Sequence, residues 1–508
     1  MILPENTLIE IFCFYVNDRD AKTGEWHTLV HVCQRWRFVV FTSPRRLRLQ
    51  LMFTGQRTIT EMLDVWPHLP IMIWVIQEPW DSDEGTSRVN NVVALLDSKH
   101  HDRICEITLV IPPSLWERIA PATQKPFPEL RTLYIRTSPN DDRAPVFSNL
   151  FLSRSTPHLR LLGLYCIQVP FPAMQELLSS CNNLVGLSLV DIPHSGYISP
   201  DMVVTCLAAL PRLKRLWLGF QSPRSRPDPQ SRRPPPFTRS VLPALASLEF
   251  HGAYEYLEEL VAQIDAPRLN NLTIYFFMDL MFDVPQLHRF ISHLEKPKRY
   301  NQATVHFSQV NATMTLSPPT SMVDSGHFSF AILCRESDWL LSSMTQLCRA
   351  ILPLFPSLER LNVMDDLGTP LHWKDDMGNT QWLELLDPFV AVKKLYLSRE
   401  VALRVGRALQ ELERERVSEV LPSLQYLFLK GLNTLGPIQE AIGKFVGARQ
   451  LSDSDHPVVV DNWERDDCKW GGVSFRGRRL FTSYHTNQIL ASNNWFHSNT
   501  TSPGFPTR

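Results

Sequence analysis

The chain has 508 residues, enough for about two to four domains or one long repeat array. Hydrophobic residues make up 44% and charged residues 20%, a composition that can bury a core. The net charge of −1 argues against bulk binding to nucleic acid or anionic membranes. The longest apolar runs fall far short of the roughly 18 residues that a membrane span needs.

The N-terminus has no basic region, and Glu5 and Glu10 interrupt its apolar stretch, so we expect no signal peptide. The nine cysteines include no C-x-x-C pair and are interpreted as reduced thiols. These features predict a soluble protein of the cytoplasm, the nucleus or both.

The first fifty residues predict two helices outside the pattern of the later chain. In the first, which begins with "LPENTLIEIF", Pro4 suits the first helical position. Its apolar face is formed by Leu8, Ile11, Phe12 and Tyr15. The second lies in "TLVHVCQRWRFVV", ends before Pro44, and repeats that spacing with Leu29, Val32, Cys33 and Trp36. So short a segment buries little by itself, so part of its apolar surface must meet the later chain or a partner.

From about residue 51 one pattern recurs, a proline followed by apolar residues two, five and seven places later. It occurs at 128–135, 157–164, 211–218, 243–250, 267–274, 356–363 and 422–429. Versions without the proline occur at 102–109, 182–189 and 390–397, and a weaker copy at 67–74. Segments with apolar residues at i, i+3, i+4 and i+7 separate these units and predict helices. A short strand and a helix every 24 to 34 residues or so are typical of a leucine-rich-repeat solenoid.

A doubly wound α/β domain is the alternative, because it also alternates strands and helices. Its strands would be near-continuous apolar runs, whereas these are short L-x-x-L-x-L units at an even pitch. The predicted fold class is therefore α/β, a short helical segment followed by a horseshoe-shaped solenoid. One repeat cannot fold alone, because ordering each residue costs about 1–2 kcal/mol and only a few large side chains are buried per repeat.

Three segments depart from the repeat. Residues 221–240 are rich in arginine and proline and predict a disordered insertion, either tolerated or a basic contact for a partner. Residues 300–345 hold the pattern poorly, with strands expected at 303–307 and 327–333. A closing helix through Ile438, Ala441, Ile442 and Phe445 and a capping strand in 456–463 are expected to end the array, and a polar, disordered tail is expected from 466.

The first fifty residues resemble an F-box. "LPENTLIEIF", then "LVHVCQRWR" about 20 residues later and then "SPRRLRL" are similar to fungal F-box proteins that carry leucine-rich repeats behind the F-box. The resemblance covers residues 3 to about 50, and the repeat architecture agrees with it. It implies an F-box at 1–50, a repeat array at 51–465 and a tail at 466–508.

In that family the F-box is a three-helix module that binds the Skp adaptor and through it a cullin scaffold. The resemblance assigns adaptor contact to matching positions, namely Leu3, Pro4, Leu8, Ile11, Phe12, Leu29, Val32, Cys33 and Trp36. Leu3, Pro4 and Ile11 are the preferred contacts, whereas Leu29, Val32 and Trp36 can equally be internal core.

The resemblance implies a non-catalytic substrate receptor of a ubiquitin ligase, and a non-degradative scaffold is the alternative. Residues between the buried leucines of the strands are expected to be exposed and to contact a protein target. The candidates are Arg131, Tyr134, Arg160, Trp217, Glu249 and Tyr396.

Motifs for catalysis are missing from the sequence, which has no H-E-x-x-H, G-x-S-x-G or G-x-G-x-x-G. "KHHDRIC" places His100, His101, Asp102 and Cys105 together, but no second ligand pair follows at zinc-binding spacing. We therefore expect neither a metal site nor a cofactor.

Overall fold

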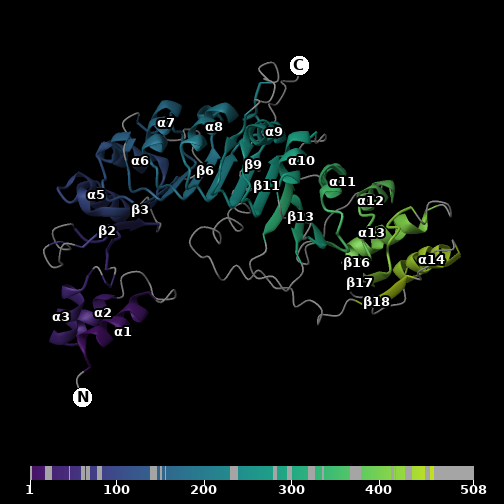
Figure 1. The fold of residues 1–508 in the computed structure, drawn as a ribbon, viewed down its shortest axis with the longest axis horizontal. Helices are drawn as coiled ribbons and strands as arrows, with labels where there is room; N and C mark the ends of the chain where they lie inside the picture. The colour runs from purple at the N-terminus through teal and green to yellow at the C-terminus, as the bar shows by residue number, and fades with distance from the viewer. Residues whose placement is uncertain are drawn as a thin grey trace, which may run out of the picture. The chain divides into compact units, whose positions relative to one another are not determined.

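The computed structural model describes most of the chain as strands and helices (Figure 1). The described residues are 3–17, 26–44, 46–47, 49–58, 63, 69–76, 83–137, 146–148, 151–154, 156–228, 238–277, 283–294, 300–318, 326–334, 337–365, 379–412, 417, 419–429, 437–451 and 458–462. They form two compact units, Met1–Ser225 with Ser240–Leu245, and Arg226–Arg239 with Ala246–Arg508.

The first unit begins with three short helices, α1 (Glu5–Asn17), α2 (Trp26–Val32) and α3 (Gln34–Thr42). Ser43 ends α3 directly before Pro44, a position where proline disfavours helical backbone in the preceding residue. The predicted end of the second helical segment is therefore confirmed.

Parallel strands follow in chain order and pair with their sequence neighbours from β1 to β7. Their bounds are β1 (Leu51–Phe53), β2 (Ile71–Val75), β3 (Ile104–Val110), β4 (Thr132–Arg136), β5 (Leu161–Tyr165), β6 (Gly186–Ile192) and β7 (Arg215–Phe220). The register aligns equivalent repeat positions, so that Leu133, Leu162, Leu187 and Leu216 form one buried ladder. Sequence position within a repeat therefore predicts position in the sheet.

Helices between these strands lie on one side of the sheet (Figure 1). They are α5 (Asp83–Asp97), α6 (Pro113–Ile119), α7 (Phe171–Ser180) and α8 (Pro200–Ala208). Short 3-10 segments are η1 (His101–Arg103), η2 (Ala120–Gln124), η3 (Phe151–Arg154) and η4 (His194–Gly196), and β8 (Ser240–Val241) lies at the end of the unit. Ser199 caps α8 by accepting a hydrogen bond from the Met202 amide, as its position before Pro200 predicts.

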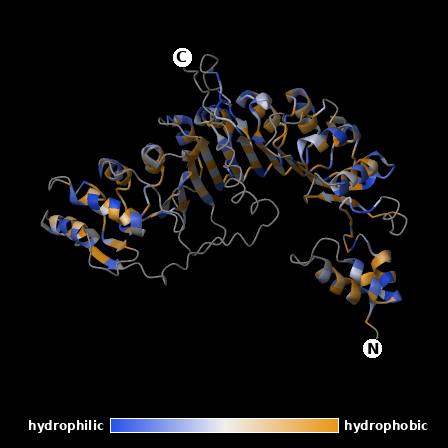
Figure 2. Cartoon of the chain, turned by 180° about the vertical axis from the view of Figure 1, so that it is seen from behind, coloured by the Kyte–Doolittle hydropathy of each residue, from blue (hydrophilic) through white to orange (hydrophobic). Residues whose placement is uncertain are grey.

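The second unit repeats this architecture. Its strands are β9 (Ser247–Gly252), β10 (Ile264–Asp265), β11 (Asn271–Phe277), β12 (Gln302–Phe307), β13 (Asn311–Ser317), β14 (His327–Leu333), β15 (Arg360–Asp365), β16 (Lys394–Leu397), β17 (Tyr426–Leu429) and β18 (Val459–Asn462). Its helices are α9 (Tyr254–Gln263), α10 (Pro285–Ser292), α11 (Ser337–Ile351), α12 (Asn379–Leu386), α13 (Arg399–Gln410) and α14 (Pro437–Leu451), and η7 (Leu352–Leu354) follows α11. Figure 2 shows hydrophobic and hydrophilic residues alternating along these helices, as amphipathic packing requires.

The strand order reverses in the middle of this unit. β11 pairs in parallel with β14, β14 and β12 pair antiparallel with β13, and β12 pairs in parallel with β15. The strands expected at 303–307 and 327–333 are present, whereas β13 between them was not predicted. Its strict alternation, with Ala312, Met314 and Leu316 buried, is the signal that could have located it.

The closing helix and the capping strand are present as α14 and β18, and Ala441, Ile442 and Phe445 are buried. The expected disorder at 221–240 is wrong for its first residues, because Ser225 is fully buried and accepts or donates a 3.3 Å hydrogen bond with the His194 ring. Residues 229–237 and the predicted tail from 466 lie outside the described residues. None of the helices in the described part of the chain has the length and hydropathy needed to cross a bilayer.

Candidate functional site

The three N-terminal helices enclose a small core of their own. Leu8, Phe12 and Leu29, which were assigned to adaptor contact, are buried in it. The Phe12 ring meets the half-buried Trp36 edge to face, with centroids 4.8 Å apart. These four side chains thus hold the helices together.

The second helical segment is two helices, which corrects the prediction of one. Cys33 has extended backbone between α2 and α3, and its sulfur accepts a hydrogen bond from the Trp36 amide at 3.4 Å. The break removes Val32 from the face formed by Leu29, and Val32 is 58% exposed. Cys33 is exposed as well.

Exposed large apolar side chains are concentrated in this segment of the chain. Of the thirteen exposed large hydrophobic residues in the described part of the chain, six lie here, namely Leu3, Ile11, Phe14, Tyr15, Val32 and Phe38. Phe14 is 81% exposed, and the preferred contacts Leu3 and Ile11 are 44% and 45% exposed. Pro4 is exposed beside them. We name the set Leu3, Ile11, Phe14, Val32 and Phe38 the apolar helix surface.

Sequence reasoning missed Trp26, which connects the helices to the chain that follows. Its ring is buried, and its Nε1 donates a 2.9 Å hydrogen bond to the Gln50 carbonyl just before β1. The Arg46 guanidinium reaches Asn6 Oδ1 at 3.2 Å and fixes the same connection to α1. The apolar helix surface is therefore presented on a defined scaffold.

On the sheet face opposite to the helices, Tyr134 and Trp217 both contact the Tyr165 ring. The centroid distances are 4.8 Å and 5.7 Å, and the Arg136 guanidinium lies 6.0 Å from the same ring. Gly163 makes this possible, because a Cβ there would lie 3.0 Å from the Tyr134 ring. Arg136 and Tyr165 were not predicted. Arg136 lies two residues after Tyr134, and Tyr165 lies two residues after Gly163, the partner of Tyr134 in the sheet.

Arg131 and Arg160 come together at the other end of the strands, directly before β4 and β5. They line an open pocket of about 370 Å³ with His158, Asn183, Val185 and Arg212. We name this site the arginine pocket. The four lining residues that were not predicted lie in the segments that directly precede the strands. Their equivalent positions in the repeat could therefore have indicated that they lie beside Arg131 and Arg160.

Glu249 lies in the second unit, where it projects from β9 on the same face as His251. Burial raises the pKa of Glu249 to about 7 and lowers the pKa of His251 to about 4. In the register with β11 the two residues are opposite Thr273 and Tyr275, and burial together with Glu249 raises the pKa of Tyr275 to about 12. These side chains are half-buried on this face of the sheet.

Tyr396 does not project freely, which departs from the expectation for that position. It is only 4% exposed, because its ring stacks on Phe428 with centroids 4.4 Å apart. The Arg360 guanidinium covers the ring at 4.1 Å. Aligned residues of successive strands thus pack on one another.

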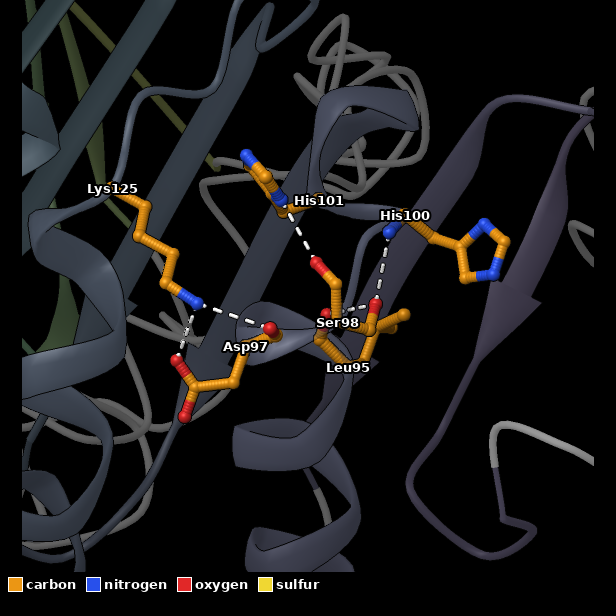
Figure 3. Close-up of polar contacts among 6 residues, drawn as sticks. All are labelled: Leu95, Asp97, Ser98, His100, His101 and Lys125. Carbon is orange, nitrogen blue, oxygen red and sulfur yellow. Dashed lines mark hydrogen bonds and ion pairs between the residues drawn. The ribbon is translucent and has the colours of Figure 1, made fainter.

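The histidines of "KHHDRIC" form hydrogen bonds to Ser98, directly after α5. Figure 3 shows the rings of His100 and His101 pointing in different directions. The His101 ring contacts the Ser98 carbonyl at 2.8 Å, and the His100 amide donates to Ser98 Oγ at 3.1 Å (Figure 3). Lys125 binds Asp97 through an ion pair at 2.8 Å. Across the described residues, no group of three or more metal-ligating side chains converges.

The fold and these surfaces define an α/β repeat protein, in which strand–helix units build a large, mostly parallel sheet. No family model matches the chain, and no curated protein matches it. Among solved structures it is similar to the leucine-rich repeat-containing protein LegL7 from Legionella pneumophila, at 15% identity and with a TM-score of 0.26. The match covers 67% of this chain and 96% of that one. A similarity this distant bears on neither function nor partners.

Proposed function

We propose that the protein is a substrate-recognition subunit of a Skp–cullin–F-box ubiquitin ligase. The N-terminal helices bind the Skp adaptor, and the repeat array binds a protein target. The chain forms no covalent bond itself; it raises the concentration of the target near a conjugating enzyme on the scaffold.

The apolar helix surface is the observation that carries this proposal. Single exposed apolar residues are ordinary, but a high share of them in one short segment favours an interaction site there. Phe14 and Val32 are more than half exposed although the same helices bury Phe12 and Leu29. The core of the three helices is thus complete without the outer residues, which are available to a partner.

Two valines of equal exposure give a matched test. Val32 lies in the apolar helix surface and Val390 lies in a turn of the second unit, and each is 58% exposed. Purified wild type and the variants Val32→Asp and Val390→Asp are mixed with recombinant Skp adaptor, and affinity is measured by calorimetry. A charge buried in an apolar contact is costly, so we expect Val32→Asp to weaken binding at least about 100-fold and Val390→Asp to leave it unchanged.

Thermal unfolding of each variant serves as the control for folding. Equal adaptor binding by wild type and Val32→Asp, with both folded, would exclude this surface as the docking site. A wild-type chain that binds no adaptor would refute the proposal altogether.

A further inference from the structure

Strands β9 and β11 bring together four side chains, Glu249, His251, Tyr275 and Phe277, which we name the β9–β11 cluster. The register places His251 opposite Tyr275. The centroid of the His251 ring lies 6.1 Å from that of the Tyr275 ring and 4.8 Å from that of the Phe277 ring. Burial, and then the nearby Glu249 carboxylate, raise the pKa of Tyr275 to about 12. A carboxylate, an imidazole and two aromatic rings are therefore neighbours on one face of the sheet.

Two polar groups of the cluster have no partner in the described part of the chain. Glu249 forms no hydrogen bond or ion pair there, and the buried Nε2 atom of His251 forms no hydrogen bond. Burial lowers the pKa of His251 to about 4, so its ring is neutral at pH 7 and one of its nitrogens is an acceptor. Because polar groups inside proteins are normally paired, these acceptors favour a ligand that donates hydrogen bonds.

The side chains beside Glu249 are small and uncharged. Thr273 lies opposite it on β11, and Ser329 continues the same row on β14. Glu249 is half-buried on this face. Glu249 and His251 offer two metal ligands, but among the described residues no third His, Cys, Asp or Glu joins them. A tetrahedral metal site needs three or four protein ligands, so an organic cation suits the cluster better.

We propose that the β9–β11 cluster binds an arginine side chain of a target protein. The guanidinium group has five N–H donors in a planar fork, which can pair with the Glu249 carboxylate and also donate to the His251 ring. Its flat face packs on aromatic rings, which Tyr275 and Phe277 supply. A lysine ammonium is a compact charge that matches the carboxylate fork and the ring faces less well.

The cost of Glu249 to the free protein supports a binding role. Burial raises the pKa of Glu249 to about 7, so its negative charge is unfavourable in the fold and no described cation offsets it. An arginine from a partner would supply the missing counter-ion. Glu249→Gln should therefore make the free protein more stable at pH 8 and weaken its binding to arginine. A carboxylate that only held the fold together would show a loss of stability instead.

This inference rests on the proposed function in one respect, that the repeat array binds a protein target, and it names the chemistry of that target. Its test needs no adaptor. Glu249→Gln should still bind the Skp adaptor, and Val32→Asp should still bind arginine peptides. The two proposals can therefore fail separately.

The test uses the 508-residue chain and an array of peptides with random flanking sequences. Each flanking sequence carries a central arginine, lysine or citrulline, which keeps the shape of arginine without its charge. Selected peptides are measured by fluorescence anisotropy at pH 8. We expect arginine peptides to bind at least about tenfold more tightly than their citrulline counterparts, because a charge-assisted hydrogen bond is lost.

Glu249→Gln should remove the preference for arginine. Glu359→Gln, at an exposed glutamate of the same unit that pairs with Lys393, should retain it. Tyr275→Phe keeps the ring and should retain most of the preference, whereas Tyr275→Leu should reduce it. Thermal unfolding shows that each variant is folded.

Four results would overturn the proposal. The array could show no preference for arginine over citrulline, or folded Glu249→Gln could keep that preference. Lysine peptides that bind as tightly as arginine peptides would assign the cluster to any cation. Spermidine that competes as strongly as the peptide would assign it to a small polyamine.

Discussion

Two side chains on β9, Glu249 and His251, make opposite contributions to the pH dependence of stability. Glu249 has its pKa raised from 4.5 to about 7, so the stability present below pH 4.5 is lost as the pH rises through 7. His251 has its pKa lowered from 6.5 to about 4, so stability is lost as the pH falls from 6.5 through 4. The two trends oppose each other between about pH 4.5 and 6.5.

Glu249→Gln should therefore stabilise the protein at pH 8 and change little at pH 4.5. Because one pKa unit corresponds to about 1.4 kcal/mol, the gain at pH 8 is at most about 3 kcal/mol. Denaturant unfolding of wild type and variant at both pH values measures it, and the His251 contribution cancels in the difference. Glu359→Gln, at an exposed ion pair with Lys393, is the control. An equal effect of Glu249→Gln at the two pH values would contradict the assignment.

For single residues, the sequence predicts which side chains belong to an apolar face better than it predicts which of them point into the core. Ile11 and Phe12 were placed on one apolar face, yet Phe12 is fully buried and Ile11 is 45% exposed. The spacing that groups them covers a wide stripe of the helix, and only the packing against Trp36 decides which residue lies inside. The residues that line the arginine pocket with Arg131 and Arg160 come from neighbouring repeats, so only their equivalent repeat positions could have indicated them.

Among the elements, β14 depends on a glycine at its start. A Cβ on Gly326 would lie 1.9 Å from the Asn270 carbonyl oxygen, which accepts a 3.0 Å hydrogen bond from the His327 amide. This contact begins the pairing of β14 with β11. Any larger residue must push the two strands apart.

Gly326→Ala should lower the free energy of unfolding by about 1–3 kcal/mol or more. Gly443→Ala in α14 is the matched change, because a Cβ there meets nothing within 4 Å. It should raise stability by about 0.5–1 kcal/mol through helix propensity. Chemical denaturation of both variants measures the difference, and two changes of the same sign would show that the close approach at β14 is wrong.

The strands were predicted correctly where the repeat is regular, and a strand was missed where the chain direction reverses within the sheet. The P-x-L-x-x-L-x-L units became strands, since each supplies the same buried positions to a parallel ladder. β13 lacks that pattern because it runs antiparallel between β12 and β14. The break at Cys33 was hidden for another reason: the helical spacing continues across it, and only the backbone shows the turn.

At the scale of the whole molecule, sequence periodicity predicted an α/β repeat protein because every repeat buries the same positions. It could not predict the partners. Binding partners are chosen by exposed residues, and the exposed residues of the apolar helix surface lie outside the repeat and follow no such pattern.

The most direct test is whether the full-length chain bridges the Skp adaptor and a cullin. The three purified proteins are mixed, and the mass of the complex is measured by size-exclusion chromatography with light scattering. We predict a complex with one copy of each protein, which Val32→Asp abolishes. A complex of this chain and the adaptor that excludes the cullin would contradict the ligase function and indicate a scaffold instead.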